Sequence, residues 1–137
     1  MVESTQKYKE DGKSEGFRHY ETARRLIDEG KFKAALRLLL LSIGKEPHFK
    51  SYELAGDCLV ALGRPLEAVS YFASATTMNR GIRAPLRLAE TWFALGYYEY
   101  TMLAANEVLR REPENKKAAS IRTKAEKGLA EKSNRVR

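Results

Sequence analysis

The stretch that decides the fold is Tyr52–Ala75, which reads YELAGDCLVALGRPLEAVSYFASA. Its apolar and small residues recur three and four positions apart on both sides of Gly63, which is the spacing of one face of an α-helix. Gly63 can adopt the left-handed backbone that ends a helix. Pro65 suits the first turn of a following helix, because that position needs no backbone N–H. The stretch therefore predicts two short helices joined by a tight turn.

Copies of this pattern lie before and after it. Gly30, Gly63 and Gly96 recur at intervals of 33 residues, and Pro47 and Pro113 stand at matching places after the first and third copies. Glycine after a helix and proline beyond it are helix stop signals. We therefore predict three helix pairs, over residues 17–29 and 32–45, 48–62 and 65–78, and 82–96 and 98–111.

The period and the small residues resemble those of the tetratricopeptide repeat (TPR) family, whose units of about 34 residues fold as helix–turn–helix. The family pattern is W-x2-L-G-x2-Y, then A-x3-F-x2-A, then proline. Three copies carry the likeness: Tyr52, Ala55, Gly56, Leu59, Ala68, Phe72 and Ala75; Ala23, Leu26, Ala35, Leu39, Ser42 and Pro47; and Leu88, Ala89, Trp92, Ala105, Val108 and Pro113. Arg80 and Thr101 depart from it. The resemblance implies an all-α, right-handed α-solenoid of antiparallel helix pairs.

The chain outside the repeats has a different character. Residues 1–14 lack a periodic apolar pattern and are expected to form a flexible N-terminal arm, with Ser14 as the N-cap of the first helix. The TPR array is predicted over residues 15–131, with repeats at about 16–48, 49–81 and 82–114 and a capping helix at 113–131. The apolar stripe of that last helix is Ala118, Ile121, Ala125 and Leu129. Residues 132–137 are predicted to be a basic tail.

The positive charge is concentrated at the C-terminal end. The net charge is +7, yet residues 114–137 hold eight Lys and Arg against three Glu. The alternative function that this suggests is a nucleic-acid-associated accessory protein that uses the basic C-terminal helix. Its phosphate contacts would be independent of base sequence, because no aromatic residues are interleaved. A capping helix whose charges only face solvent is the competing interpretation. The candidate phosphate-contact residues are Lys116, Lys117, Arg122 and Lys124.

Several functional classes are not supported by the sequence. His19 and His48 have no partners at metal-ligand spacing, and the glycines are spaced as helix ends and not as a phosphate loop. Glu53 and Asp57, four residues apart on one helix, are interpreted as a solvated pair of like charges. We therefore predict no catalytic residue, no metal and no cofactor. The protein is not expected to be an enzyme.

The location is expected to be cytoplasmic. The N-terminus is polar, without a secretory signal, and the longest apolar run, residues 36–43, is too short to span a bilayer. Cys58 is the one cysteine, and its apolar helical context predicts a buried structural thiol. A single thiol without a disulfide partner fits a reducing compartment.

The TPR resemblance implies a concave groove, lined by the first helix of each pair, in which a peptide docks. Ile27, Val60 and Phe93 stand one repeat apart and predict an apolar row in this groove, with a half-buried core row as the open alternative. The full set of predicted groove residues is Tyr20, Arg24, Ile27, Glu53, Leu54, Asp57, Val60, Arg83, Leu86, Arg87, Glu90 and Phe93.

Charged groove positions suggest a second kind of ligand. Arg83 and Arg87 match the two basic positions of the carboxylate clamp found in cochaperone TPR domains, whereas Tyr20, Arg24 and Leu54 replace its other three residues. Arg24, Arg83 and Arg87 together are expected to pair with an acidic ligand.

The predicted function is a non-catalytic protein–protein interaction module, acting as an adaptor, scaffold or chaperone-like protein. It binds a peptide or helix segment in the concave groove. The small three-repeat chaperones of secretion systems agree in size and repeat number, although they are usually acidic. A homodimer formed through the last helix is a further alternative, and membrane insertion is not expected.

Overall fold

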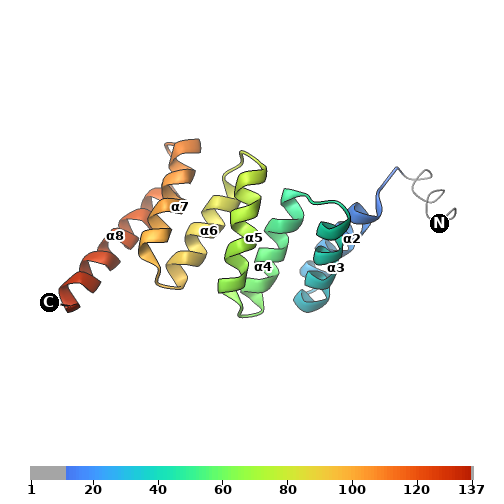
Figure 1. The fold of residues 1–137 in the computed structure, drawn as a ribbon, viewed down its shortest axis with the longest axis horizontal. Helices are drawn as coiled ribbons and strands as arrows, with labels where there is room; N and C mark the ends of the chain where they lie inside the picture. The colour runs from blue at the N-terminus through green and yellow to red at the C-terminus, as the bar shows by residue number, and fades with distance from the viewer. Residues whose placement is uncertain (1–11, 137) are drawn as a thin grey trace.

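The computed structural model describes residues 12–136, and in this part the chain is helical, without β-strands. Figure 1 shows the helices stacked side by side along one long axis, with the first and the last helix of the described residues at opposite ends of the stack. Consecutive helices contact each other from the first to the last. The helices are α2 (Glu15–Asp28), α3 (Phe32–Lys45), α4 (Phe49–Ala61), α5 (Pro65–Met78), α6 (Arg83–Ala94), α7 (Tyr98–Arg111) and α8 (Lys116–Val136). The predicted all-α array of helix pairs is confirmed.

The same turn joins the two helices of every pair. Gly30, Gly63 and Gly96 have φ angles of +74°, +76° and +82°, where residues with a side chain are strained. After Gly30, the N–H of Lys31 donates to the carbonyl of Leu26 at 2.8 Å, and the two later turns repeat this bond. This six-residue closure satisfies carbonyls that the helix end leaves without partners. The predicted turns are therefore confirmed.

The outermost helix ends agree with the sequence only in part. Ser14 caps α2 as predicted, since its hydroxyl accepts the N–H of Phe17 at 3.1 Å. Helix α8 begins at Lys116 and not at Pro113, because the Asn115 side chain caps it by accepting a later backbone N–H. It also continues to Val136, through most of the predicted tail. The predicted N-terminal arm lies mostly outside the described residues.

Small residues let the helices cross closely around a few large side chains. Ala23, Gly56 and Ala89 are buried at equivalent places in the three pairs, and Leu39 and Phe72 fill the space between helices. Alanine at a crossing brings two helix backbones close together, and one bulky residue then occupies the facing hole. No helix within residues 12–136 has the length and apolar character needed to cross a bilayer.

The contact between Gly56 and Phe72 predicts a large effect of a single methyl group. A Cβ atom at Gly56 would lie 2.5 Å from the Cε1 atom of Phe72, whose ring is fully buried. We expect Gly56→Ala to lower the free energy of unfolding by about 1–3 kcal/mol through overpacking. Gly44 is the matched control, because nothing lies within 4 Å of its Cβ position. Gly44→Ala should raise stability by about 0.5–1 kcal/mol. Urea unfolding followed by Trp92 fluorescence measures both, and equal effects would contradict the packing argument.

Candidate functional site

The first helices of the pairs lie beside one another and form one layer of the stack. Helix α2 contacts α4, and α6 contacts α8. Ion pairs link α4 to α6. The predicted groove residues all belong to α2, α4 and α6, so they share this layer. The structure thus brings them together along one side of the stack, from the first pair to the third.

A network of ion pairs joins α4 to α6 within this layer. Arg83 places Nη2 at 2.6 Å from Oδ2 of Asp57 and Nη1 at 3.5 Å from Oε2 of Glu53. Arg87 donates from Nε to Oδ1 of Asp57 at 2.9 Å and from Nη1 to Glu90 at 3.3 Å. Asp57 is thereby held by two guanidinium groups. Charge-assisted bonds of this kind fix the second pair against the third.

The interpretation of Glu53 and Asp57 as a solvated pair of like charges is wrong. Glu53 is only 7% exposed, and both carboxylates face arginines of the next pair. Burial raises the pKa of Glu53, while the positive charge of Arg83 acts in the opposite direction. The sequence spacing hid this arrangement, because the partners lie on another helix.

The free basic cluster expected from Arg24, Arg83 and Arg87 is also not what the structure shows. Arg83 and Arg87 already pair with acids of the chain itself. Arg24 is exposed on α2, with its guanidinium carbon 5.9 Å from the centre of the Tyr20 ring. A ligand carboxylate at Arg83 or Arg87 would have to displace the chain's own acids.

The apolar row is half-buried: its side chains pack on the core and keep part of their surface exposed, and its role in binding stays a prediction. Ile27 and Val60 are half-buried and pack against the core of the first two pairs. Phe93 is half-buried too, with its ring centre 5.5 Å from that of Tyr98. Two further predicted groove residues, Leu54 and Leu86, are half-buried on the same layer. Each side chain therefore leaves part of its apolar surface open to solvent.

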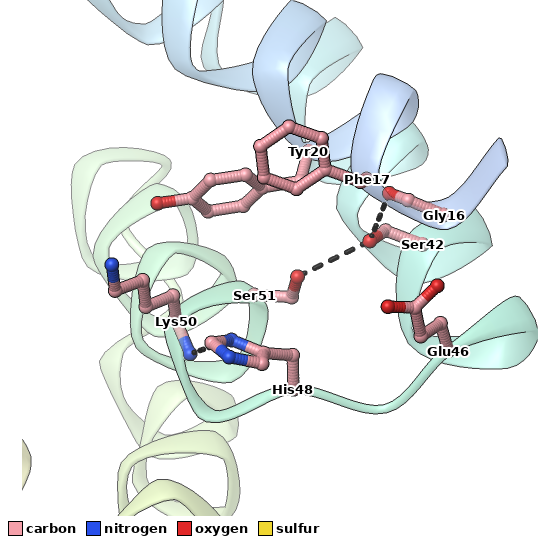
Figure 2. Close-up of a pocket in the computed structure, with 8 residues that line it drawn as sticks. All are labelled: Gly16, Phe17, Tyr20, Ser42, Glu46, His48, Lys50 and Ser51. Carbon is pink, nitrogen blue, oxygen red and sulfur yellow. Dashed lines mark hydrogen bonds between the residues drawn. The ribbon is translucent and has the colours of Figure 1, made fainter. Parts of the chain in front are cut away.

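The contact between α2 and α4 differs from the contact between α4 and α6. Tyr20 and Arg24 occupy the places that Glu53 and Asp57 hold one repeat later, and Lys50 occupies the place of Arg83. Among the described residues, Lys50 has no ion-pair partner. A cavity of about 150 Å³ opens here instead, lined by Gly16, Phe17, Tyr20, Ser42, Glu46, His48, Lys50 and Ser51 (Figure 2).

Most residues of this cavity were not among the predicted site residues. Ser42 and Ser51 are buried, at positions where the next repeat has the buried residues Ala75 and Ala84. Two serines at small core positions on either side of the boundary between the first two repeats are the sequence signal for this cavity. Without the structure nothing shows that they face each other, because they lie on α3 and α4.

The basic last helix packs as a cap on the third pair. Ala118 and Ala125 are fully buried, and α8 contacts α7 and α6. Two residues of its apolar stripe are thus covered within the chain, whereas Ile121 and Leu129 are half-buried, and the dimer suggested by the sequence stays a prediction. Lys116, Lys117 and Lys124 are exposed, whereas the half-buried Arg122 bonds to Asn106. The phosphate contacts of these residues stay a prediction.

The remaining side chains that could react or bind a metal have structural roles. His48 caps α4, since its Nδ1 accepts the N–H of Lys50 at 3.2 Å. Cys58 is fully buried, as predicted, and burial together with the charge of Asp57 raises its pKa to about 11. Within residues 12–136, no three His, Cys, Asp or Glu side chains are close enough to hold a metal ion.

The surroundings of Cys58 predict slow thiol chemistry. Only the thiolate reacts with disulfide reagents, and burial both blocks access and keeps the group protonated. We expect DTNB at pH 8 to label the native protein at least ~100-fold more slowly than the protein in urea. Rapid labelling of the native state would show that α4 opens readily.

Comparison with solved structures decides the fold. The first TPR domain of the human RPAP3 protein superimposes with a TM-score of 0.77, at 22% identity, over 88% of this chain and 96% of that one. The first TPR of Spaghetti (RPAP3) bound to the HSP90 peptide SRMEEVD gives 0.78, at 21% identity, over 85% and 94%. The chain has the tetratricopeptide-repeat fold.

A bacterial secretion chaperone superimposes as well. The Yersinia enterocolitica type III secretion chaperone SycD, in complex with a peptide of the translocator YopD, gives a TM-score of 0.70, at 15% identity, over 93% of this chain and 99% of that one. No family model and no curated protein matches the sequence. The seven helices of residues 12–136 are consistent with TPR repeats, and the predicted TPR-like α-solenoid is confirmed.

Proposed function

We propose that this TPR chain is a non-catalytic protein–protein interaction module that binds a peptide or helix segment of another protein along α2, α4 and α6. The observation that carries the proposal is the half-buried apolar row of Ile27, Val60 and Phe93 on these adjacent helices. We call α2, α4 and α6, the first helices of the three pairs, the inner helices. An apolar row at helical repeat spacing suits the apolar side chains of one docked segment. The role is that of an adaptor, scaffold or chaperone-like protein.

Two structural neighbours support this use of the fold. One is described with an HSP90 peptide and another with a peptide of the translocator YopD. This chain differs from an acid-binding site in that Arg83 and Arg87 already pair with acids of the chain itself, Asp57 among them. We therefore propose that its ligand is recognised chiefly by apolar side chains, and that the acidic end of a ligand is not required.

A peptide array tests the proposal. Fluorescently labelled protein is applied to immobilised peptides that contain amphipathic and extended apolar segments. We expect Phe93→Glu to weaken binding at least ~10-fold, because a carboxylate must then be desolvated against the apolar part of the ligand. Leu66→Glu is the matched control, since Leu66 is 60% exposed on α5, the second helix of its pair. Binding that survives Phe93→Glu would place the site elsewhere.

A further inference from the structure

The cavity between α2 and α4 has the size of one aromatic ring. Phe17 and Tyr20 form one wall, with ring centres 6.0 Å apart and planes tilted by 32°, and His48 lies on the other side (Figure 2). The volume of about 150 Å³ equals that of a protein cavity known to take up benzene. A single planar side chain therefore fits between the walls.

The two buried serines that line the cavity leave one hydroxyl oxygen able to accept a hydrogen bond from a ligand. Ser42 donates its hydroxyl proton to the carbonyl of Gly16 at 2.7 Å. Ser42 and Ser51 also share a hydrogen bond at 3.2 Å between their Oγ atoms. Because a hydroxyl has one proton, Ser51 must be the donor of this second bond. Both protons are thus in use, and the Ser51 oxygen keeps acceptor capacity for a ligand N–H or O–H.

Charges of both signs lie at the rim of the cavity. Glu46 and Lys50 line the cavity, are exposed, and have no ion-pair partner among the described residues. Arg24 lies over the outer ring, that of Tyr20. An anion would be repelled by Glu46 and attracted by Lys50 and Arg24, and the reverse holds for a cation. The aromatic walls and the Ser51 acceptor, and not these charges, therefore decide the ligand. The suitable group is an aromatic ring that carries a hydrogen-bond donor.

We propose that this cavity, the α2–α4 pocket, binds the side chain of a tyrosine or tryptophan in the segment that docks along the inner helices. The inference rests on the proposed function and adds to it the identity of one anchoring residue. Tyrosine and tryptophan combine a large apolar surface with one polar hydrogen. Phenylalanine has the ring without the donor and would leave the Ser51 acceptor without a ligand partner.

Titrations with single amino acid amides test the pocket without a partner protein. The probes are N-acetyl-tyrosinamide, N-acetyl-tryptophanamide and N-acetyl-phenylalaninamide, followed by ¹H–¹⁵N NMR of the full chain. We expect the tyrosine and tryptophan probes to shift the amides of Gly16 and Ser51. They should bind roughly 5–10-fold more tightly than the phenylalanine probe, as one hydrogen bond allows. Equal binding of all three probes, or no shift at these amides, would overturn the proposal.

Variants separate the hydroxyl from the ring wall. Ser51→Ala should make the tyrosine and phenylalanine probes bind equally, whereas Ser70→Ala on α5 keeps the preference, because Ser70 is exposed and outside the pocket. Phe17→Ala, at a residue 41% exposed, should weaken all three probes at least ~5-fold by removing one stacking wall. A preference that persists in Ser51→Ala would overturn the role of this hydroxyl.

Two further measurements identify the occupant. Phe93→Glu lies outside the pocket, so probe binding should be unchanged even where peptide binding is lost. A failure of the groove is thereby distinguished from a failure of the pocket.

Tyr8 stands eight residues before Gly16 in this chain. If removal of residues 1–11 strengthens probe binding several-fold, the chain fills its own pocket and the assignment to a partner is wrong. Unchanged probe binding supports the assignment to a partner.

Discussion

Phe72→Ala lowers the free energy of unfolding by about 3–5 kcal/mol, the usual cost of emptying a buried phenylalanine site. The ring of Phe72 is fully buried against Gly56, which has no side chain to expand into the vacated space. Helices α4 and α5 form the middle repeat. The lost packing of Phe72 therefore weakens the repeat that the first and the third repeat both contact. The void can close only if the two helices move together.

Urea unfolding followed by Trp92 fluorescence measures the change. Phe17→Ala is the matched control, because the same atoms are removed from a ring that is 41% exposed. We expect the control to lose less than about 1 kcal/mol. A loss of similar size in both variants would show that the middle repeat does not hold the array together.

Arg111→Met is expected to lower the free energy of unfolding by about 2–4 kcal/mol, since bonds from charged donors are worth more than neutral ones. The guanidinium of Arg111 donates to the carbonyls of Thr76, Asn79 and Gly81 at 2.8, 3.0 and 2.7 Å. Helix α5 ends at Met78, and the last carbonyls of a helix have no partner within it. Arg111 therefore caps α5 from α7, with its side chain only 14% exposed.

Arg110 provides an adjacent control for Arg111. Both side chains pair with Glu107, but that of Arg110 is 70% exposed and bonds to no other residue among those described. Arg110→Met should cost less than about 1 kcal/mol, as exposed ion pairs do. If thermal unfolding gives the two variants the same midpoint, the bonds of Arg111 to α5 contribute nothing to stability.

The repeat and its turns were predictable because they depend on local chemistry. Gly30, Gly63 and Gly96 end helices wherever the chain needs positive φ, and the period of small and large residues sets which faces meet. The exact ends of the helices were less predictable from the sequence. At α8, Asn115 competes with Pro113 as the start, and only the folded chain shows which is used.

The candidate site was predictable only as a layer of helices. The sequence placed the twelve groove residues on the first helix of each pair, and the structure gathers them there. It could not show that Arg83 and Arg87 turn toward Asp57, since the partners are about 30 residues apart in sequence. The same holds for the ring wall of Phe17 and Tyr20 above the bonded serines.

The sequence by itself determined the helices, their turns, their order and the core, because backbone preference and burial act through neighbours at fixed spacing. Tertiary structure decided the charges and the cavity. Whether an arginine is free, or a serine hydroxyl has a lone pair to offer, depends on side chains of other helices. Those distances are set only when the pairs stack, and so the most specific chemistry of this chain, the α2–α4 pocket, emerged from packing alone.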